Sequence, residues 1–149
     1  MSEALPPCGL YRTTVRLGPI AAGRLVSFHN HGDEGPGLFL PSGRAGGLTR
    51  FAEEGVLLDA PWWASTLDPL PFEGLYRVRE AFHCCDKRCA LFEPELLVLL
   101  SFTDEAQPAL SVPEWTDRGL DLAVQGRLIE RARIAKLCPL RVAERPRHP

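Results

Sequence analysis

The sequence predicts a mainly β protein, with α+β character only at its margins, in which a small unit is duplicated in tandem. Each unit is expected to be an SH3-like barrel or curled sheet with short helices. Two observations lead to this expectation. Blocks of the chain recur at spacings of 64 to 72 residues, and short runs of aromatic and β-branched residues alternate with turn residues. Glycine (13) and proline (14) together make up 27 of 149 residues, which is typical of a folded, turn-rich chain.

The repeat is clearest in its first block. Leu5–Arg12 returns as Leu70–Arg77 with six identities in eight positions. Matches that keep the same order along the chain are stronger than any single short match. Further matches follow in the same order. Leu25-Val26 returns as Leu97-Val98, and Pro36–Pro41 returns as Pro108–Pro113. Phe51 and Gly55 then match Trp115 and Gly119, and Leu67–Leu70 returns as Leu137–Leu140.

These blocks divide the chain into repeat unit 1 (residues 5–69), repeat unit 2 (residues 70–142) and a flexible C-terminal tail (residues 143–149). A unit of this size buries too little apolar surface to be stable by itself. We therefore expect the two units to pack as one globule.

Local patterns place the elements. Leu10–Val15 and Leu75–Val78 follow a glycine and are rich in aromatic and β-branched residues, which predicts a strand in each unit. A hairpin is predicted next, and the candidate helices come after it. The expected hairpin strands are Leu25–His31 with Leu38–Leu40 and Leu97–Phe102 with Ala109–Val112; the expected helices are Thr49–Glu54, Trp62–Leu67 and Gly126–Leu137.

Charge and hydropathy exclude some classes. The net charge of −2 argues against a protein built throughout for polyanions, although seven basic residues against two acidic ones follow Ala123. No apolar run is long enough for a membrane helix, and Met1–Ala4 lacks the layout of a signal peptide. We expect a cytoplasmic protein without a membrane partner, in which the basic C-terminal region leaves nucleic-acid binding as an alternative function.

A cysteine-rich insertion is the main candidate for chemistry. Nineteen residues separate Arg77 from Leu97, against twelve between the equivalent Arg12 and Leu25, and the extra residues include three of the five cysteines. Clustered cysteine and histidine in a reducing compartment indicate metal ligands or redox thiols before structural disulfides, and inert buried thiols are the alternative. The candidate zinc ligands are His83, Cys84, Cys85 and Cys89, with a fourth from Cys138, Cys8, His29 or His31.

The insertion also contains a difficulty for a metal site. Cys84 and Cys85 are adjacent, and in an extended segment adjacent side chains point to opposite faces. His29 and His31, two apart on a predicted strand, should instead share a face, which suits chelation. With Asp33 and Glu34 nearby they could form a hydrolytic metal centre.

Candidate binding residues are Trp62, Trp63, Arg44, His29 and His31. One of the adjacent tryptophans is expected to be exposed or wedged between the repeats. Arg44 lies in the glycine-rich segment Ser42–Thr49, which has no apparent counterpart in unit 2 and whose backbone amides could wrap an anion. No sequence motif of a known catalytic site is present, and no catalytic residue is assigned.

The leading hypothesis is therefore a non-catalytic binding or adaptor protein, with another protein as its partner. The first alternative is a zinc protein, with either a structural site in the His83–Cys89 loop or a hydrolytic site at His29 and His31. Nucleic-acid binding through the basic C-terminal region is the second. Zinc is the one cofactor that these residues suggest.

Overall fold

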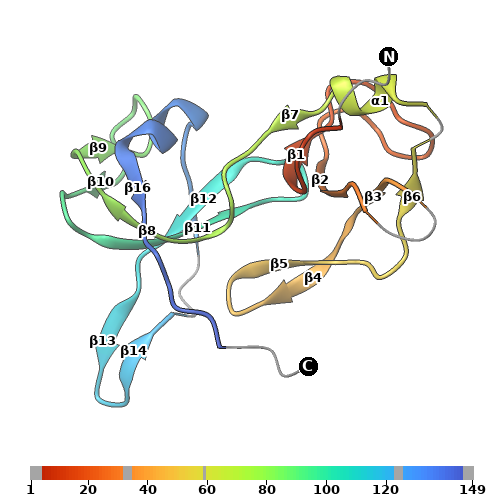
Figure 1. The fold of residues 1–149 in the computed structure, drawn as a ribbon. Helices are drawn as coiled ribbons and strands as arrows, with labels where there is room; N and C mark the ends of the chain where they lie inside the picture. The colour runs from red at the N-terminus through yellow and green to blue at the C-terminus, as the bar shows by residue number, and fades with distance from the viewer. Residues whose placement is uncertain (1–4, 32–34, 59, 123–125, 146–149) are drawn as a thin grey trace. The chain divides into compact units, whose positions relative to one another are not determined.

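Strands dominate the computed structural model, which describes residues 5–31, 35–58, 60–122 and 126–145 (Figure 1). The expected mainly β class is confirmed. The chain divides into two compact units, each described by itself below. Unit 1 comprises Met1–Glu73 and Ser101–Gln107, and unit 2 comprises Gly74–Leu100 and Pro108–Pro149.

Unit 1 is organised around a five-stranded sheet with the order β6-β3-β2-β1-β7, antiparallel throughout. The predicted strand after Gly9 and the predicted first hairpin are both present in it. The strands are β1 (Gly9–Arg12), β2 (Leu25–His29), β3 (Gly37–Phe39), β6 (Val56–Leu57) and β7 (Asp68–Pro69).

The core of unit 1 lies on one face of this sheet. Val26 and Phe28 alternate along β2 and are fully buried, and Phe28 meets the ring of Tyr11 edge to face at 5.9 Å. The Tyr11 hydroxyl donates to the carbonyl of Pro7 at 2.7 Å, so its polar end is satisfied although its ring is buried. Trp63 and Leu67 complete this core from the helical segment that follows the sheet.

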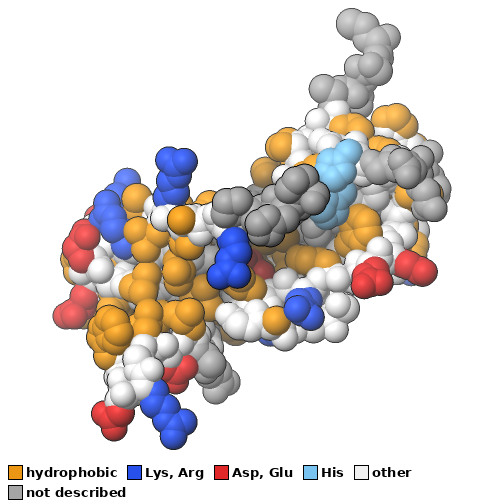
Figure 2. Space-filling view, turned by 60° about the horizontal axis from the view of Figure 1, so that its bottom comes forward, with side chains coloured by type: hydrophobic (Ala, Val, Ile, Leu, Met, Phe, Trp, Pro, Cys, Tyr) orange, Lys and Arg blue, Asp and Glu red, His pale blue; other side chains and the backbone are white. Residues whose placement is uncertain are grey.

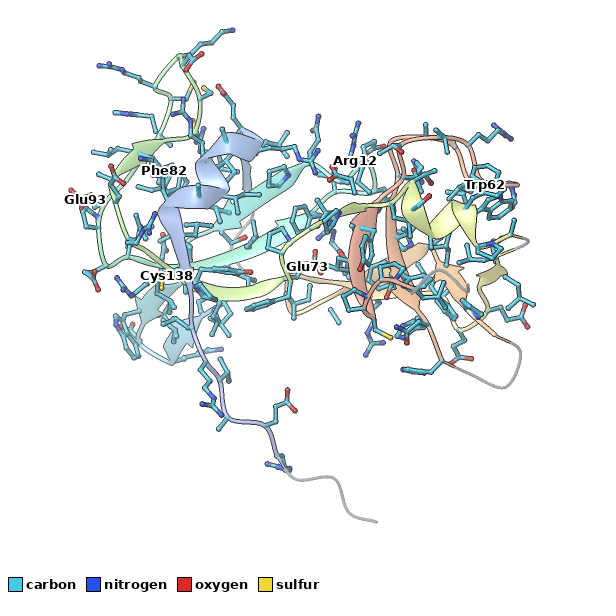
Figure 3. All side chains as sticks on the ribbon, turned by 45° about the horizontal axis from the view of Figure 1, so that its top comes forward. Arg12, Trp62, Glu73, Phe82, Glu93 and Cys138 are labelled. Atoms are coloured by element: carbon cyan, nitrogen blue, oxygen red, sulfur yellow. The ribbon has the colours of Figure 1, made fainter. Side chains whose placement is uncertain are left out.

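That helical segment, α1 (Trp62–Ser65), confirms the helix expected near Trp62, although it spans only four residues. Trp63 is 8% exposed and Trp62 is 54% exposed, with their rings edge to face at 6.2 Å. Trp62 is labelled on α1 in Figure 3. The two residues therefore differ in role, one packing in the core of unit 1 and one facing solvent.

The helix expected at Thr49–Glu54 is wrong. The segment forms a hairpin of β4 (Pro41–Ala45) and β5 (Leu48–Phe51). Its turn is Gly46-Gly47, with φ of 61° and 82°, a left-handed conformation that glycine adopts without strain. This Gly-Gly turn is the hairpin signal that the helical interpretation overlooked.

Unit 2 contains a second antiparallel sheet with the order β15-β12-β11-β8-β16 (Figure 1). Two hairpins accompany it, β9 with β10 and β13 with β14. The sheet strands are β8 (Gly74–Val78), β11 (Leu97–Phe102), β12 (Pro108–Ser111), β15 (Arg127–Leu128) and β16 (Leu137–Pro139); the hairpin strands are β9 (Phe82–His83), β10 (Leu91–Phe92), β13 (Glu114–Thr116) and β14 (Gly119–Asp121).

Apolar side chains of β8, β11 and β12 form the interior of unit 2. Val78, Val98, Leu100 and Leu110 are each at most 1% exposed. Tyr76 is also buried, and burial raises the pKa of its hydroxyl to about 12 because the charged phenolate is poorly solvated there.

Two expectations for the architecture are corrected. Neither five-stranded sheet closes into a barrel, because in the described residues the edge strands of each sheet do not pair with one another. The helix expected over Gly126–Leu137 is replaced by β15 and a 3-10 helix at Arg131–Lys136. β15 pairs with β12, with Leu128 opposite Ala109 and Arg127 opposite Leu110, and Ile129 directly after it is buried.

The two sheets place repeated residues at the same register. Tyr11 pairs with Val26 on one side and Pro69 on the other, and Tyr76 pairs with Val98 and Pro139. The sequence match of Phe51 with Trp115 does not follow this correspondence in register. Phe51 lies in the second strand of its hairpin and Trp115 in the first strand of the other hairpin.

The glycine-rich segment of unit 1 forms the β4–β5 hairpin, which follows the third strand of its sheet in chain order, as the β13–β14 hairpin does in unit 2. Among the described residues the longest helix has six residues, so none there is long enough to cross a bilayer.

Candidate metal-binding clusters

Three cysteines of the insertion converge in unit 2. Cys84, Cys85 and Cys89 lie in the loop between β9 and β10, and their sulfur atoms are all within 4.8 Å of one another. The sulfur of Cys85 lies 3.6 Å from that of Cys84 and 4.0 Å from that of Cys89. Cys84 is buried, Cys85 is half-buried and Cys89 is exposed, so the cluster extends from the interior to the surface.

The difficulty with adjacent cysteines does not arise, because β9 ends at His83 and the chain turns immediately after it. The amide of Cys84 still donates to the carbonyl of Ala90, and the amide of Arg88 then donates back to the carbonyl of Cys85. Arg88 has a φ of 55°. This tight turn removes the alternation of an extended strand, so neighbouring thiols can face the same point.

The spacing of these thiols suits a tetrahedral metal ion. Zinc binds thiolate sulfur at about 2.3 Å, so two sulfurs of a tetrahedral site lie about 3.8 Å apart. The two sulfur to sulfur distances of 3.6 and 4.0 Å lie on either side of that value. The sulfurs of Cys84 and Cys89 thus each lie at a distance from the Cys85 sulfur that suits a zinc site.

The loop also favours ionisation of one thiol. Backbone amides of Cys89 and Lys87, together with the Cys84 thiol, donate to the Cys85 sulfur and lower the pKa of Cys85. The pKa of Cys89 is raised, chiefly by its hydrogen bond to Cys85 and then by the negative charge there. The hydrogen bonds of the loop thus favour the charged form of Cys85 over that of Cys89.

A pocket of about 390 Å³ opens beside Cys85. His83 lines it, as do the cationic side chains of Arg88, Arg133 and Lys136. His83 itself pairs with Leu91 in the β9–β10 ladder and is outside the group of converging ligands. The pocket thus offers a positively charged approach to the thiols.

A second group of potential ligands lies in unit 1, where Cys8, His29 and His31 also present ligand atoms within 4.8 Å of one another. Sequence reasoning paired His29 and His31 as a possible hydrolytic metal centre, but it named Cys8 only as a candidate for the fourth ligand of the cysteine loop. The missed signal was the pairing of the first strand with the strand that ends at His29. In the observed register Gly9 pairs with Phe28, which brings Cys8 beside His29.

The remaining predicted site residues lie elsewhere. Cys138 is on β16, away from the β9–β10 hairpin (Figure 3). Arg44 donates to the carbonyl of Phe102 within unit 1 and so is engaged in packing the β4–β5 hairpin. Asp33 and Glu34, proposed partners of the histidines, lie outside the described residues.

The basic C-terminal region is partly neutralised by acidic residues of unit 2. Arg133 pairs with Asp86 at 3.0 Å, and Lys136 pairs with Glu80 at 3.0 Å. Both are exposed or half-exposed pairs, so they position the 3-10 helix more than they stabilise it. Residues 146–149 of the expected tail lie outside the described part of the chain.

Comparison with known proteins finds no match. The chain matches no protein-family model, no curated protein and no solved structure. The functional argument therefore rests on the geometry of the two clusters and on the surface of each unit.

Proposed function

We propose that this chain is a zinc-binding protein whose primary site is formed by Cys84, Cys85 and Cys89. The observation that carries the proposal is the convergence of the three sulfurs within 4.8 Å, with the two distances from Cys85 close to those of a tetrahedral thiolate site. Thiolate is the ligand type that zinc prefers in structural sites.

The surroundings support the same assignment. Three thiolates and one Zn²⁺ carry a net charge of −1, and the cation of Arg88 lines the neighbouring pocket together with the ion pair of Arg133 and Asp86. Three protein ligands leave a fourth position, which we place toward this pocket, open to water or to the imidazole of His83 after a change of rotamer.

The test is elemental analysis of untagged protein combined with thiol counting before and after a chelator. We expect about one zinc per chain to depend on this loop, with its thiols protected until the chelator removes the metal. Cys85→Ser should weaken zinc binding in the loop at least about 100-fold, because it removes the central ligand of the group.

Cys138→Ser is the matched control, since Cys138 is a half-buried cysteine of the same unit outside the cluster. It should leave zinc content unchanged. The proposal is overturned if Cys85→Ser retains the zinc of the wild-type chain. It is also overturned if the thiols are released by a reductant and not by a chelator, which would indicate a disulfide instead.

A second candidate, protein binding as in the leading hypothesis, is favoured by the β13–β14 hairpin. Trp115 and Leu120 are directly opposite in its register, so their side chains share one face, and they are 82% and 41% exposed. Hydrophobic side chains gather on the face of unit 2 that carries this hairpin (Figure 2). We propose a second copy of this chain as the partner, because exposed apolar patches mark protein interfaces and homodimers are the commonest assemblies.

Sedimentation velocity over a range of concentrations tests this interface. The wild-type chain should dimerise, and Trp115→Glu should weaken the association at least about tenfold, because tryptophan is often a dominant contact in interfaces. Leu57→Glu, at an exposed leucine of unit 1, is the control and should leave it unchanged. A wild-type chain that stays monomeric at every concentration would exclude self-association through this hairpin.

We also propose that the two five-stranded sheets derive from one duplicated unit, without the barrel. The support is their common strand order and the matching registers of Tyr11 and Tyr76. A duplicated unit would have diverged at its loops, where insertions are tolerated, and the cysteine loop of unit 2 is such an insertion.

A further inference from the structure

A second and chemically different site lies in unit 1. We propose that Cys8, His29 and His31 bind a late first-row divalent metal ion, Zn²⁺ above all, with at least one coordination position left for water or an external ligand. The inference goes beyond the zinc site of the cysteine loop, because the two groups share no residue and belong to different units.

Strand pairing brings these ligands together. Cys8 directly precedes β1, and His29 is the last residue of β2. Because Gly9 pairs with Phe28 in antiparallel register, the next pair along the ladder is Cys8 and His29. His31 follows two residues later, and its ring lies 5.7 Å from that of His29, measured between centroids. One thiol and two imidazoles therefore meet at the end of the sheet.

Neighbouring groups hold these ligands in place. The amide of Asn30 donates to the Cys8 sulfur at 3.3 Å, and the Asn30 side chain donates to the carbonyl of Pro6 at 2.9 Å. The Ser27 hydroxyl lies 3.3 Å from Nε2 of His29. Amide donors to a ligand sulfur and a polar partner on a ligand imidazole are the outer contacts that orient metal ligands. Where serine holds Nε2, Nδ1 is the His29 nitrogen left for the metal.

Glu73 directly precedes β8, as Cys8 directly precedes β1, and at Glu73 this position is covered by other groups. The Glu73 carboxylate accepts a hydrogen bond from the amide of Phe102, and the Cys8 sulfur likewise accepts one from the amide of Asn30. The β4–β5 hairpin then covers Glu73, because the amide and the hydroxyl of Thr49 both donate to its carboxylate at 2.8 Å. At Cys8 two imidazoles take the place of these donors, and the thiol remains exposed.

The donor set determines which ion fits. One thiolate with two neutral imidazoles suits Zn²⁺ and its stand-in Co²⁺, and is poorly suited to Mg²⁺ or Ca²⁺, which prefer oxygen. Among the described residues three ligands converge here, and a zinc site with three protein ligands and an open position binds substrate or water, whereas closed four-ligand sites are structural. With one thiolate the site carries a net charge of +1, which favours an anionic or carbonyl ligand at the open position.

Cobalt titration of the full chain tests the site independently of the cysteine loop. The background for this test is a variant in which Cys84, Cys85 and Cys89 are all replaced by serine, and circular dichroism checks that it folds. This background should bind one Co²⁺ per chain with a near-ultraviolet sulfur-to-cobalt absorption, and Zn²⁺ should displace it. Adding Cys8→Ser should abolish the absorption and weaken binding at least about 100-fold, while adding Cys138→Ser should change neither.

If the triple-serine background fails to fold, His29→Ala in the otherwise unchanged chain replaces it, and the count of bound Co²⁺ should fall from two to one. The proposal is overturned if the folded background binds no Co²⁺, or if its absorption survives Cys8→Ser. If instead the cysteine loop of unit 2 binds no metal, the result is different. The wild-type chain would then bind one Co²⁺, and Cys85→Ser would leave that ion in place.

Discussion

Phe28→Ala is expected to lower the free energy of unfolding of unit 1 by about 3 to 5 kcal/mol. Phe28 is fully buried at the centre of β2, and its ring packs edge to face against Tyr11. Removing it leaves a cavity and loses an aromatic pair in a unit too small to compensate. Because whole domains are stable by only about 5 to 15 kcal/mol, much of unit 1 should unfold near room temperature.

Urea unfolding followed by circular dichroism and by tryptophan fluorescence measures this effect. Trp62 and Trp63 lie in unit 1, whereas Trp115 of unit 2 is already 82% exposed, so most of the fluorescence change on unfolding should come from the burial lost by Trp63. Leu57→Ala is the control, because Leu57 is 46% exposed on the edge strand β6 and its truncation should cost less than about 1 kcal/mol. Equal losses in the two variants would contradict the assignment of the core to the Phe28 face.

Glu73→Ala should have the second largest effect, about 2 to 3 kcal/mol. The Glu73 carboxylate accepts three hydrogen bonds of 2.8 Å, from the amide and hydroxyl of Thr49 and from the amide of Phe102. Without it two backbone amides lose their acceptor, and the β4–β5 hairpin loses its main polar attachment. The hairpin should open locally before the rest of unit 1 unfolds.

Hydrogen exchange followed by mass spectrometry detects this opening. Peptides that contain Thr49 or Phe102 should exchange faster in Glu73→Ala than in wild type, with a smaller effect for Glu73→Gln, which keeps one acceptor oxygen. Glu93→Ala, at an exposed glutamate (Figure 3), is the matched control and should leave the exchange of both peptides unchanged. Unaltered exchange at Thr49 in Glu73→Ala would show that the hairpin is held by other contacts.

Much of the local structure could be predicted from the sequence, since strand and turn preferences act over a few residues. The strand at Leu75–Val78, the Leu25–His29 and Leu38 hairpin and the helix near Trp62 were all indicated by local pattern. Two helices were predicted wrongly, because only local patterns guided the prediction. Thr49–Glu54 and Gly126–Leu137 contain residues at helical spacing, but pairing with neighbouring strands decided their conformation.

The candidate sites were predicted only in part. Sequence reasoning selected the cysteine insertion by its length and composition, but it treated Cys84 and Cys85 as diverging because it assumed an extended backbone. It also paired His29 with His31 but did not place Cys8 beside them. A thiol 21 residues before a histidine becomes its neighbour only when the register of two strands is known.

The sequence by itself thus determined the β class, the turns and the residue types available for metal chemistry. The tertiary structure decided which of these residues meet. Strand register placed Cys8 beside His29, and the turn after β9 brought three thiols within 4.8 Å of one another. The physical reason is that backbone preferences are local, whereas register and loop closure depend on burying side chains that are far apart along the chain.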